Sequence, residues 1–300
     1  MTHSISLFDY QSEGVAEIRA AYRSGARGVL YVLPTGGGKT VVSTYIAKAA
    51  QEKGTRVLFS AHRRELVLQL SAALSSWGVE HGVIAPWCRE TRHPVQVASK
   101  DTLARRIKLD RDRNRYEFDL IVTDEAHHLA PGTQWAQVLE HSPAARYLGI
   151  TATPCRLDGK PLGRAVGGFF DVMVEGPTIC DLIERGRLAR PVVYRPAEAP
   201  DLSAVRVKRG EFDQEALADA MDKQSLTGDA IEHYRRHCDR VPSIAFCVNL
   251  VHAAHVAEAF QRAGYSAAML SGKTPDKERE RMIRDLGTGG LNVLVSVNTV

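Results

Sequence analysis

The chain has 300 residues, of which 44% are hydrophobic and 25% charged, and its formal net charge is +4. This length is typical of two domains, and the apolar content suffices for two ordinary cores, which excludes an intrinsically disordered chain. The N-terminal segment lacks the basic start and apolar core of a secretory signal, and no apolar run is long enough for a transmembrane helix, so we expect no membrane association. A modest positive charge is only weak evidence for a nucleic-acid partner.

The cysteines and histidines show no pattern typical of a structural metal or disulfide. Five cysteines, an odd number without CxxC spacing, argue against a disulfide framework, a zinc ribbon or an iron–sulfur cluster. We therefore expect a protein of the reducing cytoplasm. Two histidine pairs could bind a metal in principle, although surface or packing histidines are far commoner: His233 with His237, and His252 with His255.

Strands and helices alternate between residues 27 and 155. Apolar, β-branched runs predict strands at 29–33, 57–60, 95–98, 118–123 and 146–150. Helices are predicted at about 39–53 and 63–77, between the first three of these strands. Such alternation indicates a parallel sheet covered by helices on both faces.

The second half of the chain begins with a change of pattern. A glycine-rich apolar segment at 162–170 and a short helix near 178–185 come first, and residues 195–210 then show little periodicity. We expect the domain connection there, with an N-terminal domain over 1–198 and a linker plus a second domain over 199–300. Alternation resumes with helices at 213–221, 226–236, 251–263 and 275–286 and strands at 243–248, 266–270 and 292–297. The predicted fold class is α/β, with two parallel-sheet domains.

A glycine-rich loop between the first predicted strand and helix is typical of a phosphate-binding site. Glycines let the backbone amides converge on a phosphate, and the helix start adds its positive end. Lys39 would then lie between the β- and γ-phosphates, and the Thr40 hydroxyl would join a magnesium shell. Leu33 stands where the usual GxxxxGK[ST] pattern has its first glycine, and a glycine-rich turn with a solvated lysine is the alternative. The predicted nucleotide-binding residues of the loop are Thr35, Gly36, Gly37, Gly38, Lys39 and Thr40.

A second motif follows a buried strand about ninety residues later. An acidic residue at the end of such a strand costs desolvation unless it faces a cation, so Asp124 is predicted to bind magnesium together with Thr40. Glu125 is placed to orient or deprotonate an attacking water. His127 is predicted to relay the state of the γ-phosphate and His128 to be structural. A zinc site is the weaker alternative, because adjacent histidines point apart and no further ligand occurs at useful spacing.

The sequence Asp124-Glu125-Ala126-His127 is identical to the DEAH box, and with the glycine-rich loop it resembles superfamily-two DEAD/DEAH-box helicases. The resemblance implies two RecA-like domains of the P-loop NTPase class, ATP and Mg2+ as cofactors, and a nucleic-acid partner. Lys39, Asp124, Glu125 and His127 would be the catalytic residues. Gln11, within Tyr10-Gln11, resembles the upstream glutamine element that reads adenine in this family.

Further elements of that family occur in its order along the chain. The segment 62–69 resembles the element that meets the nucleic-acid backbone, which implies contacts from Arg63 and Arg64. The segment 97–103 resembles the next backbone-contacting element. The TATP sequence at 151–154 resembles the motif that links the nucleotide site to the strand-binding surface. The resemblance thus assigns binding or coupling to Arg63, Arg64, Ser99, Thr102, Thr151 and Thr153.

The resemblance extends into the second domain, at 245–249 and 270–279. The spacing and the segment 156–159 are closest to the branch of restriction-enzyme motor subunits and UvrB-like helicases. The implied activity is that of an ATP-dependent helicase or translocase, acting on DNA rather than RNA, with any partner subunits unspecified.

The family pattern continues beyond the last residue, Val300, with a glycine–aspartate element and an arginine finger. We therefore expect an incomplete second domain in a piece of a longer protein. The alternative is a truncated product that acts as a non-catalytic ATP-binding switch or nucleic-acid-binding scaffold. Stimulation of ATP hydrolysis by nucleic acid would separate the two.

Overall fold

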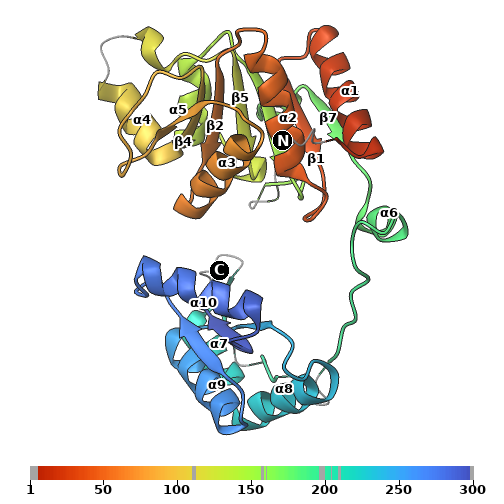
Figure 1. The fold of residues 1–300 in the computed structure, drawn as a ribbon, viewed down its shortest axis with the longest axis vertical. Coiled ribbons are helices and arrows are strands. Elements are labelled where there is room, and N and C mark those ends of the chain that lie inside the picture. The colour runs from red at the N-terminus through yellow and green to blue at the C-terminus, as the bar shows by residue number, and fades with distance from the viewer. Residues whose placement is uncertain are drawn as a thin grey trace. The chain divides into compact units, whose positions relative to one another are not determined.

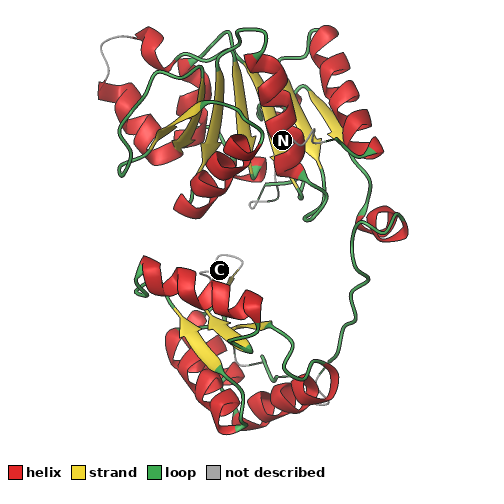
Figure 2. Cartoon of the chain, in the orientation of Figure 1, coloured by secondary structure: helices red, strands yellow, loops and turns green. Residues whose placement is uncertain are grey.

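The structure is a computed structural model that describes residues 6–109, 113–156, 159, 161–195, 200–203, 205–208 and 211–297. The chain divides into two compact units, Met1–Arg190 and Pro191–Val300, each with helices flanking a sheet (Figures 1 and 2). The domain boundary expected between residues 198 and 199 lies outside the described residues, as do residues 157 and 158 of the segment 156–159.

The first unit is built on a seven-stranded sheet in the order β3-β4-β2-β5-β6-β1-β7, in which every pairing is parallel. All five strands predicted before residue 155 are present, and the prediction missed the two edge strands, β3 and β7. Edge strands are half exposed, so these two short segments offer no long apolar run to recognise. The strands are β1 Gly28–Val32, β2 Val57–Ala61, β3 His81–Ile84, β4 Val95–Ser99, β5 Leu120–Asp124, β6 Arg146–Thr151 and β7 Val172–Glu175.

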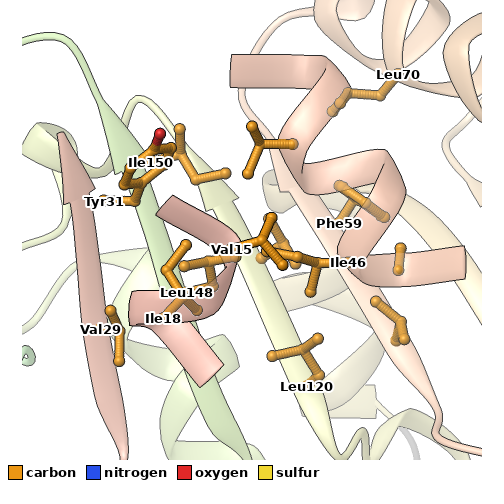
Figure 3. Packing of buried hydrophobic residues seen from close by; sticks show 14 of the residues in the cluster. Val15, Ile18, Val29, Tyr31, Ile46, Phe59, Leu70, Leu120, Leu148 and Ile150 are labelled. Carbon is orange, nitrogen blue, oxygen red and sulfur yellow. The ribbon is translucent and has the colours of Figure 1, made fainter. Parts of the chain in front are cut away.

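Side chains alternate between the two faces of this sheet, and each face has its own core. Helices α1 (Asp9–Arg23), α2 (Lys39–Gln51) and α3 (Arg64–Ser76) cover one face, where Ile18, Ile46 and Leu70 pack against strand residues such as Phe59 and Leu148 (Figure 3). Helices α4 (Lys100–Leu109) and α5 (Gln134–His141) supply the other core. Because both faces are buried, the central strands read as continuous apolar runs. The short helix predicted near residues 178–185 is present as α6 (Ile179–Glu184).

The second unit repeats the arrangement around a smaller parallel sheet, in the order β10-β12-β11. One face packs against α8 and α9 and the other against α10. A short antiparallel pair, β8 with β9, begins within the segment expected to be aperiodic. The sequence did not predict these strands, because two residues leave no alternation to recognise. The elements are β8 Val207–Lys208, β9 Glu211–Phe212, α7 Gln214–Met221, α8 Gln224–His237, β10 Ser243–Phe246, α9 Leu250–Arg262, β11 Ala267–Leu270, α10 Asp276–Thr288 and β12 Val293–Ser296.

The prediction of an α/β fold with two parallel sheets is therefore confirmed within the described residues. In the first sheet the carboxyl ends of β4, β2, β5, β6 and β1 meet at a single edge. The loops that leave these strands carry every motif singled out in the first half of the sequence except the one at Tyr10-Gln11. Open α/β sheets bind their ligands at this edge. No helix among the described residues combines the length and apolar character needed to cross a bilayer.

Candidate nucleotide site and nucleic-acid interface

The glycine-rich loop runs from the end of β1 to the start of α2 and is packed closely on two sides. Gly36 and Gly38 have φ angles of 82° and 90°, in the left-handed region that favours glycine. A Cβ on Gly38 would lie 2.3 Å from Gln11 Nε2, and one on Gly36 would lie 2.6 Å from Leu188 Cδ2. Neither position has room for a side chain, so the loop keeps the bare backbone that a phosphate cradle needs.

Leu33, at the position of the missing consensus glycine, is a core residue. Its side chain is fully buried, and its backbone N–H donates to the Thr151 carbonyl oxygen at 2.9 Å. A Cβ on Gly176 would lie 2.7 Å from Leu33 Cδ1. The absence of a side chain at Gly176, just after β7, therefore makes the room that Leu33 occupies.

Lys39 and Asp124 bring the two motifs of the sequence together. Burial raises the pKa of the Asp124 carboxyl, the Glu125 charge raises it further, and the Lys39 ammonium is close enough to lower it in part. The Lys39 ammonium also donates to the Leu33 carbonyl oxygen at 3.4 Å. A half-buried carboxylate in this position fits a hard cation, because a cation would offset the cost of keeping the charge partly out of water. Thr40 lies in the first turn of α2 and is exposed.

Glu125 has an unusual backbone conformation and contacts His127. Its φ angle is 52°, in the left-handed region, and its N–H donates to Asp124 Oδ1 at 3.0 Å. The Glu125 side chain is about one third exposed, and its Oε2 lies 3.3 Å from His127 Nδ1. The turn therefore keeps the Asp124 carboxylate against the sheet and leaves the Glu125 carboxylate accessible.

A short hydrogen-bond relay starts at His127. Its Nδ1 lies 3.0 Å from the Thr151 hydroxyl, which donates to the Thr153 carbonyl oxygen at 3.0 Å and accepts from the Thr153 N–H at 3.1 Å. Because the Thr151 hydroxyl proton is already used, we assign the proton of the contact to His127 Nδ1. The relay connects the turn after β5 with the end of β6.

His128 packs against two other histidines. Its ring lies 4.2 Å from the His127 ring, so the adjacent histidines do not point apart as expected. It lies 5.2 Å from the His62 ring at an interplanar angle of 63°, and the Trp135 ring lies 6.4 Å from His62. Burial lowers the pKa of the His62 and His128 imidazoles, and nearby positive groups lower it further. Among the described residues, no group of three or more His, Cys, Asp or Glu side chains could hold a metal ion.

Gln11 binds the loop backbone through a buried side chain. Its Nε2 donates to the Gly37 carbonyl oxygen at 3.1 Å, and the Tyr10 hydroxyl donates to the same oxygen at 2.9 Å. Gln11 Oε1 accepts from the Phe8 N–H at 3.0 Å. The Arg187 guanidinium lies 3.7 Å from the centre of the Phe8 ring, next to the helix that carries Gln11. This contact joins distant parts of the chain, so no local pattern announces it.

The residues predicted to meet nucleic acid follow the ends of adjacent strands. Arg63 and Arg64 follow β2, where Arg63 precedes the first residue of α3, and both are exposed. Ser99 ends β4 in register with Ala61 of β2, and Thr102 lies in the first turn of α4. These four side chains share one end of the β4–β2 pair. Thr153 is exposed and follows β6 at the same edge of the sheet.

The family model described as "Type III restriction enzyme, res subunit" matches residues 4–156. A "51.5 kDa protein" of a Lactococcus phage (isolate 7-9) is 32% identical over 271 residues, which cover 89% of this chain and 54% of the phage protein. Irc3 of Schizosaccharomyces pombe, whose name describes a mitochondrial ATP-dependent helicase, is 30% identical over 98% of this chain and 49% of its own length. The chain thus spans about half the length of these curated relatives.

Solved helicase structures share the fold. The crystal structure of MrfA, a DUF1998 helicase bound to DNA, superposes with a TM-score of 0.60 at 16% identity. The match covers 98% of this chain and 42% of MrfA. At this identity the match is evidence for the fold alone.

Proposed function

Because the chain belongs to the Type III restriction enzyme res subunit family, we propose that it is the ATP-hydrolysing part of a nucleic-acid helicase or translocase. This membership agrees with the resemblance of its motifs to superfamily-two helicases. The observation that carries the proposal is that the glycine-rich loop with Lys39 and the turn with Asp124 and Glu125 leave the carboxyl edge of one sheet, where the Lys39 charge lowers the pKa of Asp124 in part. A P-loop lysine and two acidic residues at one edge are typical of nucleoside triphosphate hydrolysis.

Different residues would bind the phosphates, bind Mg2+ and activate the attacking water. The glycine loop and Lys39 would hold the phosphates of ATP, with the charge of Lys39 near the β- and γ-phosphates. Thr40 and Asp124 would hold Mg2+, which supplies neutralisation of the phosphate charge. Glu125 is accessible and would orient or deprotonate the attacking water. Gln11 would hold the Gly37 backbone in place for the nucleotide, through the hydrogen bond from its Nε2 to the Gly37 carbonyl oxygen.

Coupling to nucleic acid would run through His127, Thr151 and Thr153. Their hydrogen bonds join the turn after β5 to the end of β6. A change at the phosphate that moves His127 would thereby move the Thr153 backbone. Arg63 and Arg64 would hold phosphate oxygens, with hydrogen bonds from Ser99 and Thr102, and such contacts do not distinguish base sequences.

DNA is the proposed nucleic acid, in preference to RNA. The support is the family description, which names a restriction enzyme, a class that acts on DNA. We also propose the cytoplasm as its location, on the pattern of cysteines alone.

The test is ATP binding and hydrolysis with and without DNA. We expect the protein to bind Mg-ATP. Single-stranded and double-stranded DNA are each added, and at least one of them should raise the rate of ATP hydrolysis. Lys39→Ala should weaken ATP binding roughly 10- to 150-fold, the value of a lost charge-assisted contact. Lys48→Ala is the matched control, because the Lys48 ammonium lies in the same helix but donates to the Trp77 carbonyl oxygen.

The outcomes separate the proposal from its alternative. ATP binding without stimulation by any nucleic acid would favour a non-catalytic ATP-binding switch or scaffold. Equal loss of ATP affinity in Lys39→Ala and Lys48→Ala would contradict the assignment of the loop to phosphate.

A further inference from the structure

An exposed tryptophan lies at the same edge of the sheet as the predicted nucleic-acid contacts. Trp87 occupies the turn that follows β3, and 43% of its surface is exposed. Tryptophan has a large apolar side chain, and leaving so much of it in water is costly unless a partner covers it. No motif of the sequence includes this residue.

The turn that carries Trp87 is anchored at both ends. Ala85 is fully buried, and its carbonyl oxygen accepts from the Cys88 N–H at 3.3 Å and from the Arg106 guanidinium at 3.4 Å. The Glu90 carboxylate accepts from Arg106 at 2.7 Å, from Arg115 at 3.1 Å and from the Tyr116 hydroxyl at 2.9 Å. A ring held on such a turn loses little entropy on binding, which favours a preformed contact surface.

The position of Trp87 follows from the sheet order. β3 is the edge strand and pairs in parallel with β4, which pairs in parallel with β2. The ends of the three strands therefore carry Trp87, Ser99 and Arg63 in succession. The Arg64 guanidinium lies 5.1 Å from the centre of the Trp87 ring, so a charge suited to phosphate and a flat apolar surface are adjacent.

We propose that Trp87 is a stacking surface for a base of single-stranded DNA whose phosphates are held by Arg63 and Arg64. The inference rests on the proposed nucleic-acid binding and adds a contact that phosphate binding does not require. Aromatic side chains stack on any base, so the contact is indifferent to sequence. It does require an unpaired base, because the bases of a duplex are already stacked on one another. Trp87 would thus let the protein prefer single strands over duplex.

The experiment compares an oligo(dT) strand with an abasic strand of the same length. Trp87→Ala should weaken binding of the full chain to oligo(dT) roughly 5- to 150-fold, the value of one stacked base. Binding to the abasic strand should stay within about twofold of the parent protein, because only phosphates are recognised there. The salt dependence should keep its slope, since the number of phosphate contacts is unchanged. Trp87→Phe should retain most of the affinity for oligo(dT).

Two controls keep the test sharp. Met173→Ala removes an apolar side chain, 49% exposed, from β7 at the opposite edge of the sheet, and should leave both affinities unchanged. The chain has two other tryptophans, Trp77 and Trp135. Oligo(dT) should therefore quench the fluorescence of Trp77→Phe, which keeps Trp87, but not that of Trp87→Phe, which lacks it. Thermal melting shows whether each variant is folded.

The results distinguish this inference from the function on which it rests. If the parent protein binds oligo(dT) and Trp87→Ala binds it equally well, the stacking contact is wrong and the helicase proposal stands. Equal losses for oligo(dT) and abasic strands would also overturn it, because Trp87 would then only support the turn. A parent protein that binds neither strand would overturn the stacking contact, and one that also failed to bind duplex DNA would contradict the proposed function itself.

Discussion

Glu125 combines an unfavourable backbone conformation with an accessible carboxylate. A non-glycine residue at φ 52° costs roughly 1–3 kcal/mol, and such strain persists where the surroundings enforce it. Here the hydrogen bond from the Glu125 N–H to Asp124 Oδ1 enforces it. The result is that two adjacent, half-buried carboxylates face different environments, with burial raising the pKa of the Asp124 carboxyl and about one third of the Glu125 side chain exposed. Adjacent acids in one extended strand would instead point to opposite faces.

Substitution of Glu125 by glutamine tests the role proposed for its charge. Glu125→Gln should lower the turnover of ATP roughly 10²- to 10⁴-fold, the contribution of a general base, and leave the dissociation constant for ATP within a few fold. The measurements are steady-state hydrolysis and equilibrium nucleotide binding. Glu140→Gln, which makes the same change at an exposed position of α5, should alter neither. Hydrolysis at the parental rate in Glu125→Gln would remove Glu125 from the role of base.

Thr151 is the residue whose hydroxyl holds the relay together. Thr151→Val keeps the shape but removes the hydroxyl that links His127 Nδ1 to the Thr153 backbone. We expect ATP affinity to change less than about threefold. The stimulation of hydrolysis by DNA should fall up to about tenfold, the value of one lost hydrogen bond. Thr151→Ser retains the hydroxyl and should restore most of the stimulation. Full stimulation in Thr151→Val would show that the relay does not couple the two sites.

At the scale of elements, the glycine loop is defined by what packs around it. Leu33 departs from the consensus pattern, yet it is completely buried in the core shared by α1, α2 and β1. Gly176, after β7, provides the space. Leu33 and Gly176 lie far apart in the sequence, so the motif alone gives no reason for a leucine at the consensus glycine position. In the folded unit it is part of the core.

Replacing Leu33 by the consensus glycine should therefore destabilise the first unit. We expect Leu33→Ala to lower the free energy of unfolding of the first unit by about 2–5 kcal/mol, and Leu33→Gly by at least as much, because each leaves a cavity. Denaturant unfolding followed by circular dichroism measures this. Met173→Ala, at an exposed strand position, should cost about 0.5 kcal/mol or less. If Leu33→Gly were as stable as the parent, the packing explanation would be wrong.

The elements themselves were largely predictable where both faces of a strand are buried. The strand ending at Asp124 and the strand ending at Thr151 stand out as apolar runs, since neither face meets water. The edge strands β3 and β7 and the pair β8–β9 were missed because they are short and half exposed. Hydrophobic periodicity arises where side chains are buried, and few side chains of these segments are buried.

At the scale of the whole molecule, the chain consists of two units joined by an exposed segment. Residues 191–195 are all exposed, and α6 precedes them within the first unit. The domain boundary expected at residue 198 stays a prediction. Each unit has its own cores, so each has the main requirement for independent stability.

Limited proteolysis tests this division. Elastase, which cuts after small apolar residues, should cut first after Val192 or Val193 and release two fragments that then resist digestion, because exposed connecting segments are cleaved before packed elements. Mass spectrometry identifies the cut sites. Replacing both valines by aspartate should delay the first cut markedly. Early cleavage within the sheet of the first unit, without stable fragments, would contradict the two-unit organisation.

The sequence by itself determined the α/β class and the position of both nucleotide motifs, because each motif lies in a strand–loop–helix unit whose signals are local. Only the tertiary structure showed that Asp124 and Lys39 follow strands of one sheet at the same edge, that Leu33 fills the space at Gly176, and that Arg64 lies over Trp87. These arrangements join residues that are far apart in the chain or belong to different strands. They depend on strand order and side-chain packing, which no local pattern encodes.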